Sequence, residues 1–407
     1  MRVLFSGGGT GGHIYPTLSL AEALLQGDKD AGTCEPTDKA GRSSGAAARN
    51  AIEQTNSSNL HAVLFVGAEG NIDEELLTRD GIPYKTVGSQ PMAGKSGLAS
   101  ALSLAGNAAA VAQAIPIISH FRPDAVVGGG GYACAPAVLA GAILRRAGRL
   151  PKLRITLIEP NVIPGLATRR LARYANEVWG GYADCDTARH FGDKFRLTGI
   201  PVRADLYTPI PKDQARRALG LQPDRFTLLV FGGSQGARSI NVATSGMVTH
   251  RRLPADWQVL HLAGKRDYEW MAAERKREPN DNHYLVKAYL DRMALAYWAA
   301  DLALCRSGAS TLAEVATVGL PAIFVPYPHA SENHQRANAD YFVDRGAAFT
   351  MMDAILTPDS LYWMIIDAAE PEKLNSVSAA LRRLAQPRAV ESMLARLLDT
   401  GPTLTLA

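Results

Sequence analysis

The sequence predicts an α/β protein made of two doubly wound, Rossmann-like domains with a cleft between them. Short apolar runs alternate with helical stretches along most of the chain, which is typical of parallel sheets covered by helices. The alternation occurs in both halves, and 407 residues are enough for two hydrophobic cores. Glycine-rich stretches follow several of the apolar runs, as expected where loops at the carboxyl ends of strands bind a ligand.

In the first half, the apolar runs predict five parallel strands. They are Val3–Ser6, Ala62–Val66, Tyr84–Val87, Ala125–Val127 and Ile155–Ile158. A helix over about residues 17–25 follows the first strand, with Pro16 marking its first turn. Residues 26–59 are polar, rich in small side chains and poor in apolar periodicity. We therefore expect a flexible surface insertion there.

The second half repeats the pattern. Its predicted strands are Thr227–Phe231, Gln258–Leu262, Leu302–Cys305 and Ala322–Val325. A Gly and a Pro in LTGIPVRADL (197–206) mark the boundary between the halves. We expect an N-terminal domain over residues 1–200 and a C-terminal domain over 201–378. The segment 379–407 carries an amphipathic helix, AVESMLARLLDT (389–400), expected to pack back on the N-terminal domain.

The composition is ordinary for a soluble protein, with 47% hydrophobic and 20% charged residues. A net charge of +4 without a Lys/Arg stripe argues against nucleic acid as a partner. Four cysteines lie far apart, which indicates reduced thiols in a cytoplasmic protein, and we expect no signal peptide. The uncharged segment Ser96–Phe121 is weakly hydrophobic, and Leu98, Leu102, Ala105, Ala109 and Ala112 form one helical stripe. This stripe either packs on its own domain or rests on a membrane.

Four strand-to-helix junctions carry the chemistry. They are GGGTGG (7–12), GGGG (128–131), GGSQGA (232–237) and RSGAST (306–311). Glycines let the backbone approach a ligand, and a helix N-terminus offers free N–H groups with partial positive charge. Four such junctions over two domains predict a cleft that holds diphosphate-bearing ligands.

The first junction has the G-x-G-x-x-G spacing of a dinucleotide site, with Glu69 after the second strand as its acidic partner. Two features argue against that interpretation. HIYP separates Gly12 from the expected helix start, and Glu69 lies 57 residues after Gly12 instead of about 20.

Six stretches in order give a specific resemblance that covers nearly the whole chain. They are GGGTGGHIYP, GGGGYACAP, EPNVIPGLATRRLA, TGIPVR, FGGSQGARSIN and CRSGASTLAEVATVGLPAIFVPYPHASENHQRANA. The chain resembles the MurG family of peptidoglycan N-acetylglucosaminyltransferases. This resemblance implies a GT-B fold and inverting transfer of N-acetylglucosamine from UDP-N-acetylglucosamine to undecaprenyl-diphospho-muramoylpentapeptide (lipid I to lipid II), with no metal and no cofactor. It also implies peripheral attachment to the cytoplasmic face of the membrane, with other cell-wall synthesis proteins as potential partners.

Inverting transfer needs a base for the acceptor hydroxyl and positive potential for the departing diphosphate. His13 is the candidate base, because the field of the following helix disfavours its protonation. It could instead pack against that helix or cap it. Glu159 is the rival base, or a carboxylate that orients a ligand hydroxyl or a neighbouring loop.

The resemblance places further ligand contacts in the first half. They are Thr10, Gly11, Gly12, Tyr132 and Asn161. Tyr132 lies in the second junction, where the family is thought to hold the acceptor, and it could otherwise be a packing aromatic. Ile158 and Pro160 stand where the family usually has His and Gln, so the match is weaker around Asn161.

In the second half the resemblance implies a donor site. Arg203 and Ser234 match residues near the diphosphate, although a linker charge and a helix cap are the plain alternatives. Leu290 matches the residue whose backbone reads uracil. Gln335 matches the residue that bonds the sugar hydroxyls, and an amide suits that role because it both donates and accepts.

The fourth junction completes the implied donor site. Its residues are Ala309, Ser310, Thr311, Leu312, Ala313 and Glu314. In the family the Glu at this position accepts hydrogen bonds from the ribose diol. Thr311 and Glu314 also have the spacing of a capping box, in which Glu314 would serve only the helix.

Other functions remain open at this stage. A transferase of the same superfamily could glycosylate a diacylglycerol, and an epimerase of the same fold could act on UDP-N-acetylglucosamine without a lipid acceptor. A non-catalytic scaffold is disfavoured because the matched site residues are present.

Overall fold

A computed structural model describes the chain except residues 9–10, 30–60, 70–72, 91–96, 234, 251–252, 278–282 and 399–407. The chain divides into two compact units. Unit 1 comprises Met1–Pro201 and Arg388–Ala407, and unit 2 comprises Val202–Pro387. Unit 2 therefore continues past residue 378, where the sequence placed its end.

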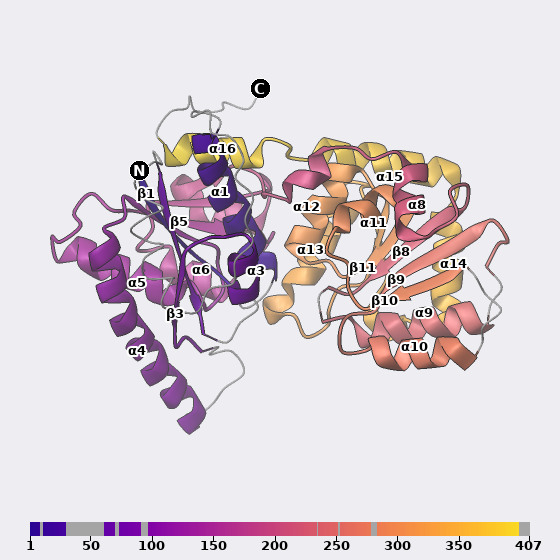
Figure 1. The fold of residues 1–407 in the computed structure, drawn as a ribbon, viewed down its shortest axis with the longest axis horizontal. Coiled ribbons are helices and arrows are strands. Elements are labelled where there is room, and N and C mark those ends of the chain that lie inside the picture. The colour runs from indigo at the N-terminus through magenta and orange to yellow at the C-terminus, as the bar shows by residue number, and fades with distance from the viewer. Residues whose placement is uncertain are drawn as a thin grey trace, which may run out of the picture. The chain divides into compact units, whose positions relative to one another are not determined.

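Within the described residues, unit 1 is built on a seven-stranded parallel sheet in the order β3-β2-β1-β4-β5-β6-β7 (Figure 1). Its elements are β1 (Arg2–Ser6), α1 (Gly11–Lys29), β2 (Ala62–Ala68), α3 (Asp73–Arg79), β3 (Tyr84–Val87), α4 (Gly97–Phe121), β4 (Ala125–Gly128), α5 (Ala135–Arg146), β5 (Arg154–Glu159), α6 (Leu166–Leu171), β6 (Glu177–Gly180), α7 (Asp186–Phe191), β7 (Phe195–Leu197) and the returning α16 (Ala389–Leu397). The order reverses between β1 and β4, which makes that pair the topological switch point.

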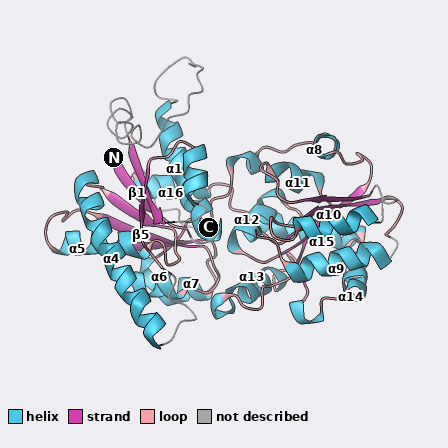
Figure 2. Cartoon of the chain, turned by 60° about the horizontal axis from the view of Figure 1, so that its bottom comes forward, coloured by secondary structure: helices cyan, strands magenta, loops and turns pink. Residues whose placement is uncertain are grey.

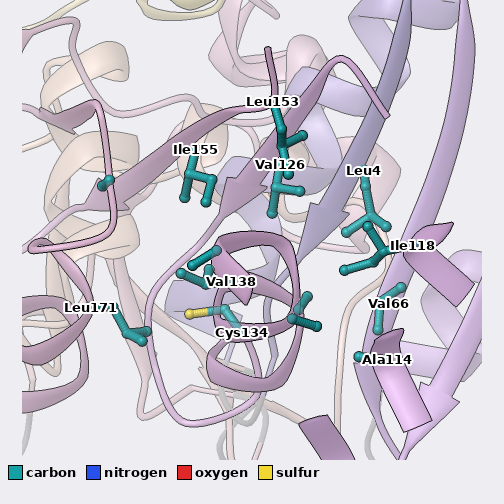
Figure 3. Close-up of a cluster of buried hydrophobic side chains, with 14 of the residues drawn as sticks. Leu4, Val66, Ala114, Ile118, Val126, Cys134, Val138, Leu153, Ile155 and Leu171 are labelled. Carbon is teal, nitrogen blue, oxygen red and sulfur yellow. The ribbon is translucent and has the colours of Figure 1, made fainter. Parts of the chain in front are cut away.

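The strands of this sheet alternate their side chains between two cores. Leu4 of β1 packs with Ile118 of α4 and Val138 of α5 on one face (Figure 3). Val3 and Phe5 point to the opposite face. A strand buried on both faces reads as a continuous apolar run, which is why the sequence predicts these strands well.

Helix α16 lies against α1 in unit 1 (Figure 1). Met393 and Leu397 are buried in the same core as Phe5. Polar contacts hold its end, because the Arg154 guanidinium donates to the Leu397 carbonyl and Arg396 pairs with Glu177 at 3.2 Å. The last described helix thus belongs to the first unit.

In the described part of unit 2, a six-stranded parallel sheet has the order β10-β9-β8-β11-β12-β13. Its elements are η3 (Ala204–Tyr207), α8 (Lys212–Leu219), β8 (Phe226–Phe231), α9 (Arg238–His250), β9 (Trp257–Leu262), α10 (Tyr268–Arg277), β10 (Tyr284–Lys287), α11 (Met293–Ala299), β11 (Leu302–Cys305), α12 (Ala309–Val318), β12 (Ala322–Phe324), η4 (Ser331–Asn333), α13 (His334–Val343), β13 (Phe349–Thr350), η5 (Asp353–Ile355), α14 (Pro358–Ala368) and α15 (Pro371–Leu384). The sheet runs between α8 and α11 on one side and α9 and α14 on the other (Figure 2). Its switch point is the pair β8 and β11.

Several expectations need correction. Helix α1 extends over Gly11–Lys29, so residues 26–29 of the expected insertion are helical and the rest of it lies outside the described residues. The strands β6, β7, β10 and β13 have no prediction from the sequence, because they are short and three of them are largely half-buried. Unit 2 extends to Pro387 because α15 packs on α12, where the Ser378 hydroxyl donates to the Gly319 carbonyl at 2.6 Å.

The described members of the apolar stripe on α4 face solvent. Ala105, Ala109 and Ala112 are exposed, whereas Ala110, Ala114 and Ile118 are buried against unit 1. The stripe is therefore not the face that packs on the domain. By length and composition Ser103–Phe121 could span a membrane, and 22% of that stretch is buried.

A carboxyl pair makes the stability of unit 1 depend on pH. Burial, together with the charge of Asp80 and a hydrogen bond to it, raises the pKa of Glu22 from 4.5 to about 7. The folded state therefore binds a proton more tightly than the unfolded state, so the free energy of unfolding falls as pH rises from about 5 to about 7. We expect Glu22→Gln, which cannot ionise, to raise the melting temperature at pH 8 and to leave it nearly unchanged at pH 4.5.

Thermal melts at both pH values check this prediction. Glu69→Gln is the control, because Glu69 is exposed and outside this pair, and it should change the melting temperature little at either pH. Equal effects of Glu22→Gln at pH 4.5 and pH 8 would contradict the assignment.

Candidate functional site

The four glycine-rich junctions lie at the two switch points. In unit 1, β1 pairs with β4 so that Ser6 stands opposite Gly128, and the first and second junctions begin side by side. In unit 2, β8 pairs with β11 so that Phe231 stands opposite Cys305, and the third and fourth junctions begin side by side. Ligands of open α/β sheets bind at such points. Each unit therefore carries one candidate site.

The first junction leads directly into α1. The helix begins at Gly11 and not at Pro16–Thr17, so Pro16 lies in its second turn. A proline in the second turn removes the backbone hydrogen bond to the Gly12 carbonyl, whereas a proline at the first helical position removes none, and that preference led the sequence rule to place the helix start at Pro16. The backbones of Gly11, Gly12 and His13 form the first turn, whose N–H groups have no acceptor within the helix.

One of the two features that argue against a dinucleotide site is not present in the structure. Gly12 lies inside the helix start, as the third glycine of a dinucleotide site does, so HIYP does not separate it from the helix. Thr10 lies outside the described residues, and the side chain of His13 lies outside them as well.

The second junction packs closely under its helix. A Cβ at Gly128 would lie 2.9 Å from Leu157 Cδ2, so only glycine fits the end of β4 without a shift. The Ser89 hydroxyl donates to the carbonyl of Tyr132 at 3.2 Å. The Tyr132 side chain is half-buried, at the turn just before α5.

Glu159 holds the loop that follows β5. Its Oε1 accepts from the backbone N–H and the side-chain amide of Asn161, at 3.1 and 2.9 Å. Its Oε2 accepts from the backbone N–H of Gly165 at 3.0 Å. The residue is 2% exposed, so the carboxylate serves the loop 160–165. This geometry favours the loop-orienting alternative for Glu159, with Asn161 as its partner.

The third junction closes on the loop after β9. Gly236 has φ +77°, and a Cβ there would overlap the carbonyl oxygen of Ala263. The Asn241 amide donates to the same Ala263 carbonyl at 2.8 Å and to Asp267 at 2.9 Å. Ser234, at the centre of the junction, lies outside the described residues.

The buried side chain of His261, on β9, supports this junction through its hydrogen bonds. His261 bridges the Tyr284 hydroxyl at 2.7 Å and the Asn241 side-chain oxygen at 3.0 Å. Burial lowers the pKa of His261 to about 3, so the ring is neutral and can hold one donor and one acceptor role. The third junction therefore packs on a network of hydrogen-bonded polar side chains, which holds it rigidly.

The fourth junction begins α12 at Ala309, with Gly308 as the N-cap. Thr311 is inside the helix, so the alternative interpretation of Thr311 and Glu314 as a capping box is wrong. The Ser310 hydroxyl is buried at the helix start and has no hydrogen-bond partner among the residues described. Ala309 and Leu312 are buried, and Thr311 and Ala313 are half-buried.

Glu314 lies in the second turn of α12 and is 6% exposed. Its Oε2 accepts from the Tyr297 hydroxyl at 2.6 Å, and its Oε1 lies 3.5 Å from Arg203 Nε. The structure thus brings the predicted residues Arg203 and Glu314 together. The sequence offers no signal for Tyr297, because α11 reads as an ordinary apolar helix.

Gln335 belongs to the same edge of unit 2. Its side-chain oxygen accepts from the backbone N–H of Tyr327 at 3.0 Å, and its carbonyl accepts from the Ser307 hydroxyl at 2.7 Å. Arg306, the first residue of the fourth junction, has no individual prediction from the sequence. Its guanidinium donates to the Ser239 hydroxyl of α9 at 2.9 Å and to the Asp353 carboxylate after β13 at 2.5 Å. Leu290 is half-buried in the loop before α11.

The described part of the chain holds no cluster of three or more His, Cys, Asp or Glu side chains placed to bind a metal. The two candidate sites consist of helix N-termini, backbone amides, the buried carboxylates of Glu159 and Glu314, and arginine side chains.

Two family models match the chain. The glycosyltransferase family 28 N-terminal domain matches residues 51–179, and the glycosyltransferase family 28 C-terminal domain matches residues 227–393.

Curated relatives are similar over their full length. The chain is 36% identical to the UDP-N-acetylglucosamine–N-acetylmuramyl-(pentapeptide) pyrophosphoryl-undecaprenol N-acetylglucosamine transferase of Desulforudis audaxviator, over 97% of both chains. It is 35% identical to the transferase of the same name from Desulfitobacterium hafniense, over 98% of this chain and 100% of that one.

A solved structure shares the fold. The crystal structure of Acinetobacter baumannii MurG matches with a TM-score of 0.67 and 24% identity, over 98% of this chain and 99% of that one. The predicted fold class, two Rossmann-like domains of GT-B type, is confirmed.

The close approach of the loops after β8 and β9 gives a stability prediction. Gly236→Ala both forces a positive φ on alanine and overlaps the Ala263 carbonyl. Gly220→Ala is a matched control, because Gly220 has φ +79° but nothing lies within 4 Å of its Cβ position. We expect Gly220→Ala to lower the free energy of unfolding by about 1–2 kcal/mol, and Gly236→Ala to lower it by clearly more. Chemical denaturation measures both, and equal losses would contradict the proposed close packing.

Proposed function

The chain belongs to the MurG family within glycosyltransferase family 28, and from this membership we propose its reaction. The enzyme transfers N-acetylglucosamine from UDP-N-acetylglucosamine to the lipid-linked muramoylpentapeptide, undecaprenyl-diphospho-muramoylpentapeptide, converting lipid I to lipid II. The observation that carries this conclusion is the full-length similarity to transferases named for that reaction. The two switch-point sites agree with it, because both substrates carry a diphosphate.

The chemistry follows from the substrates. The muramoyl hydroxyl attacks the anomeric carbon of the donor, the bond from that carbon to the diphosphate oxygen breaks, and UDP leaves. A base accepts the hydroxyl proton, and positive potential stabilises the charge that develops on the diphosphate. We propose direct displacement, which inverts the anomeric configuration, without a metal ion.

We assign the acceptor to unit 1. The first turn of α1, with Gly11 and Gly12, presents N–H groups to an anion beside the second junction. Tyr132 lies in that second junction. These features support binding of the acceptor diphosphate by the loops after β1 and β4, with Thr10 in the first of them.

His13 is the base in this proposal. Its backbone lies in the first turn of α1, where the helix field disfavours a protonated imidazole and so favours a ring that can accept a proton. Glu159 is the weaker candidate, because its oxygens already accept from Asn161 and Gly165 and it is buried. Glu159 and Asn161 then shape the acceptor loop.

We assign the donor to unit 2. The backbone amides of the third junction with Ser234, the start of α12 with Ser310, and Arg203 would bind the diphosphate of UDP. Glu314 would accept hydrogen bonds from the ribose, Leu290 would contact uracil, and Gln335 would bind the sugar hydroxyls.

A transfer assay tests the reaction and the base together. Labelled N-acetylglucosamine is followed from its UDP donor to a short-chain analogue of the lipid-linked muramoylpentapeptide, with EDTA present. We expect transfer by the wild type and a kcat loss of about 100-fold or more in His13→Ala, with donor binding kept. His190→Ala, an exposed histidine of unit 1, is the control and should behave as wild type.

The assay also separates the alternatives. Glu159→Gln should mainly raise the KM for the acceptor, and a kcat loss confined to that variant would make Glu159 the base. Epimerised donor without transfer would indicate the epimerase, and transfer only to diacylglycerol would indicate the lipid glycosyltransferase.

We also infer that the enzyme is a peripheral protein of the cytoplasmic membrane face, and that α4 of unit 1 rests on the lipid. Leu104 is 61% exposed, and Ala105, Ala109 and Ala112 are exposed on the same half of the helix. An uncharged, apolar helix surface of this kind suits the interface of a bilayer, where the lipid-linked acceptor resides.

Vesicle binding tests the role of α4. Leu104→Glu removes an apolar side chain and adds a charge, so we expect roughly tenfold weaker binding to anionic phospholipid vesicles. Ile355→Glu is the matched control, because Ile355 is 60% exposed in unit 2, and it should leave vesicle binding unchanged. Equal losses of vesicle binding in the two variants would contradict the assignment of α4 as the membrane-binding helix.

A further inference from the structure

The two oxygens of the Glu314 carboxylate have different neighbours. A neutral hydrogen-bond donor lies at Oε2, and a charged group lies at Oε1. Tyr297 donates its hydroxyl to Oε2 at 2.6 Å, which is the distance of a strong hydrogen bond to a charged acceptor. Arg203 approaches the other oxygen, Oε1, at 3.5 Å through Nε. The two oxygens therefore differ, because one accepts a short hydrogen bond and the other faces an arginine at longer range.

Tyr297 is itself rigidly placed. Its ring is 1% exposed and packs edge-on against Phe231, the last residue of β8, with ring centroids 5.7 Å apart. Burial and the neighbouring Glu314 charge raise the pKa of the Tyr297 phenol well above its usual value. The hydroxyl therefore keeps its proton at physiological pH and always has that proton to donate to Glu314.

A fixed carboxylate matters for recognising a vicinal diol. Two neighbouring hydroxyls are held well only if the plane of the carboxylate is set before the ligand arrives, because each rotamer that must be frozen on binding weakens affinity. The short bond to Tyr297 fixes Oε2 and so sets that plane. Oε1 then keeps its direction toward Arg203, the residue assigned to the diphosphate of the same ligand.

We propose that Tyr297 is a positioning residue that orients the Glu314 carboxylate for the donor ribose, and thereby determines the preference for ribonucleotides over deoxyribonucleotides. This inference rests on the proposed function, since it takes the donor to be a uridine diphosphate sugar bound in unit 2. Tyr297 acts through Glu314 and need not touch the ligand.

The test compares two ligands on the full-length protein. Calorimetric titration gives the Kd of UDP and of 2′,3′-dideoxy-UDP, which lacks both ribose hydroxyls. We expect the wild type to prefer UDP, and Tyr297→Phe to reduce that preference by roughly fivefold to tenfold, with most of the loss in the Kd of UDP. In the transfer assay the same variant should raise the KM of the donor and change kcat little.

Tyr284→Phe is the matched control. It also removes a buried tyrosine hydroxyl bonded at 2.7 Å, but to His261 and not to Glu314. A merely structural effect would weaken UDP and dideoxy-UDP in equal proportion, and we expect that outcome for Tyr284→Phe. The same outcome for Tyr297→Phe would overturn the inference.

The outcomes distinguish a failure of this inference from a failure of the proposed donor assignment on which it rests. A wild type that does not bind UDP, or that binds both ligands equally, would refute the donor assignment itself. A wild type that prefers UDP, with the preference unchanged in Tyr297→Phe, would refute only the role of Tyr297. Where Tyr297→Phe does not fold, Tyr297→Met removes the donor with an adaptable side chain, and the same ratio of dissociation constants decides.

Discussion

The parallel pairing of β1 with β4 and of β8 with β11 is the constraint on which the rest of both units depends. Ser6 stands opposite Gly128, and Phe231 stands opposite Cys305, so in each sheet two strands end at the same level. Because parallel strands carry their carboxyl ends to one edge, the glycine-rich loop of each strand starts beside that of its neighbour. In unit 1 helices α1 and α5 begin at this edge of their sheet, and in unit 2 helices α9 and α12 begin at the corresponding edge of theirs.

In unit 2 the close backbone approach at that edge is accompanied by buried polar groups that pair with one another. The Ala263 carbonyl, which meets Gly236, also accepts from Asn241, and Asn241 is held in turn by the neutral ring of His261. Arg306 likewise donates hydrogen bonds to both Ser239 and Asp353. Burying such groups is costly unless each is paired, and once paired they make the loops rigid before a ligand arrives. That rigidity is what electrostatic stabilisation of a leaving diphosphate requires.

Unit 1 is completed by a segment from the far end of the chain. Helix α16 covers the core face that β1 shares with α1, and Glu177 of β6 binds both Arg396 of this helix and Arg196 of β7. Helix α16 is thus part of the packing that holds the sheet behind the loops after β1 and β4. The opposite face is covered by α4 and α5, and α4 leaves an apolar surface exposed beyond that packing.

The sequence by itself determined the two-fold α/β pattern, the four junctions and the family. These are local signals: buried strands read as apolar runs, and glycines stand where a backbone needs room. Weak local signals failed at the half-buried strands β7 and β13. They also failed at Pro16, where a helix-start rule placed the beginning of α1 at Pro16–Thr17 instead of Gly11.

Only the tertiary structure decided what the site carboxylates do. Glu159 turned out to hold a loop, and Glu314 to face Tyr297 and Arg203 with no capping box at all. The physical reason is that strand order and long-range hydrogen bonds join residues far apart in the chain, and such pairs leave no periodicity in the sequence that could reveal them.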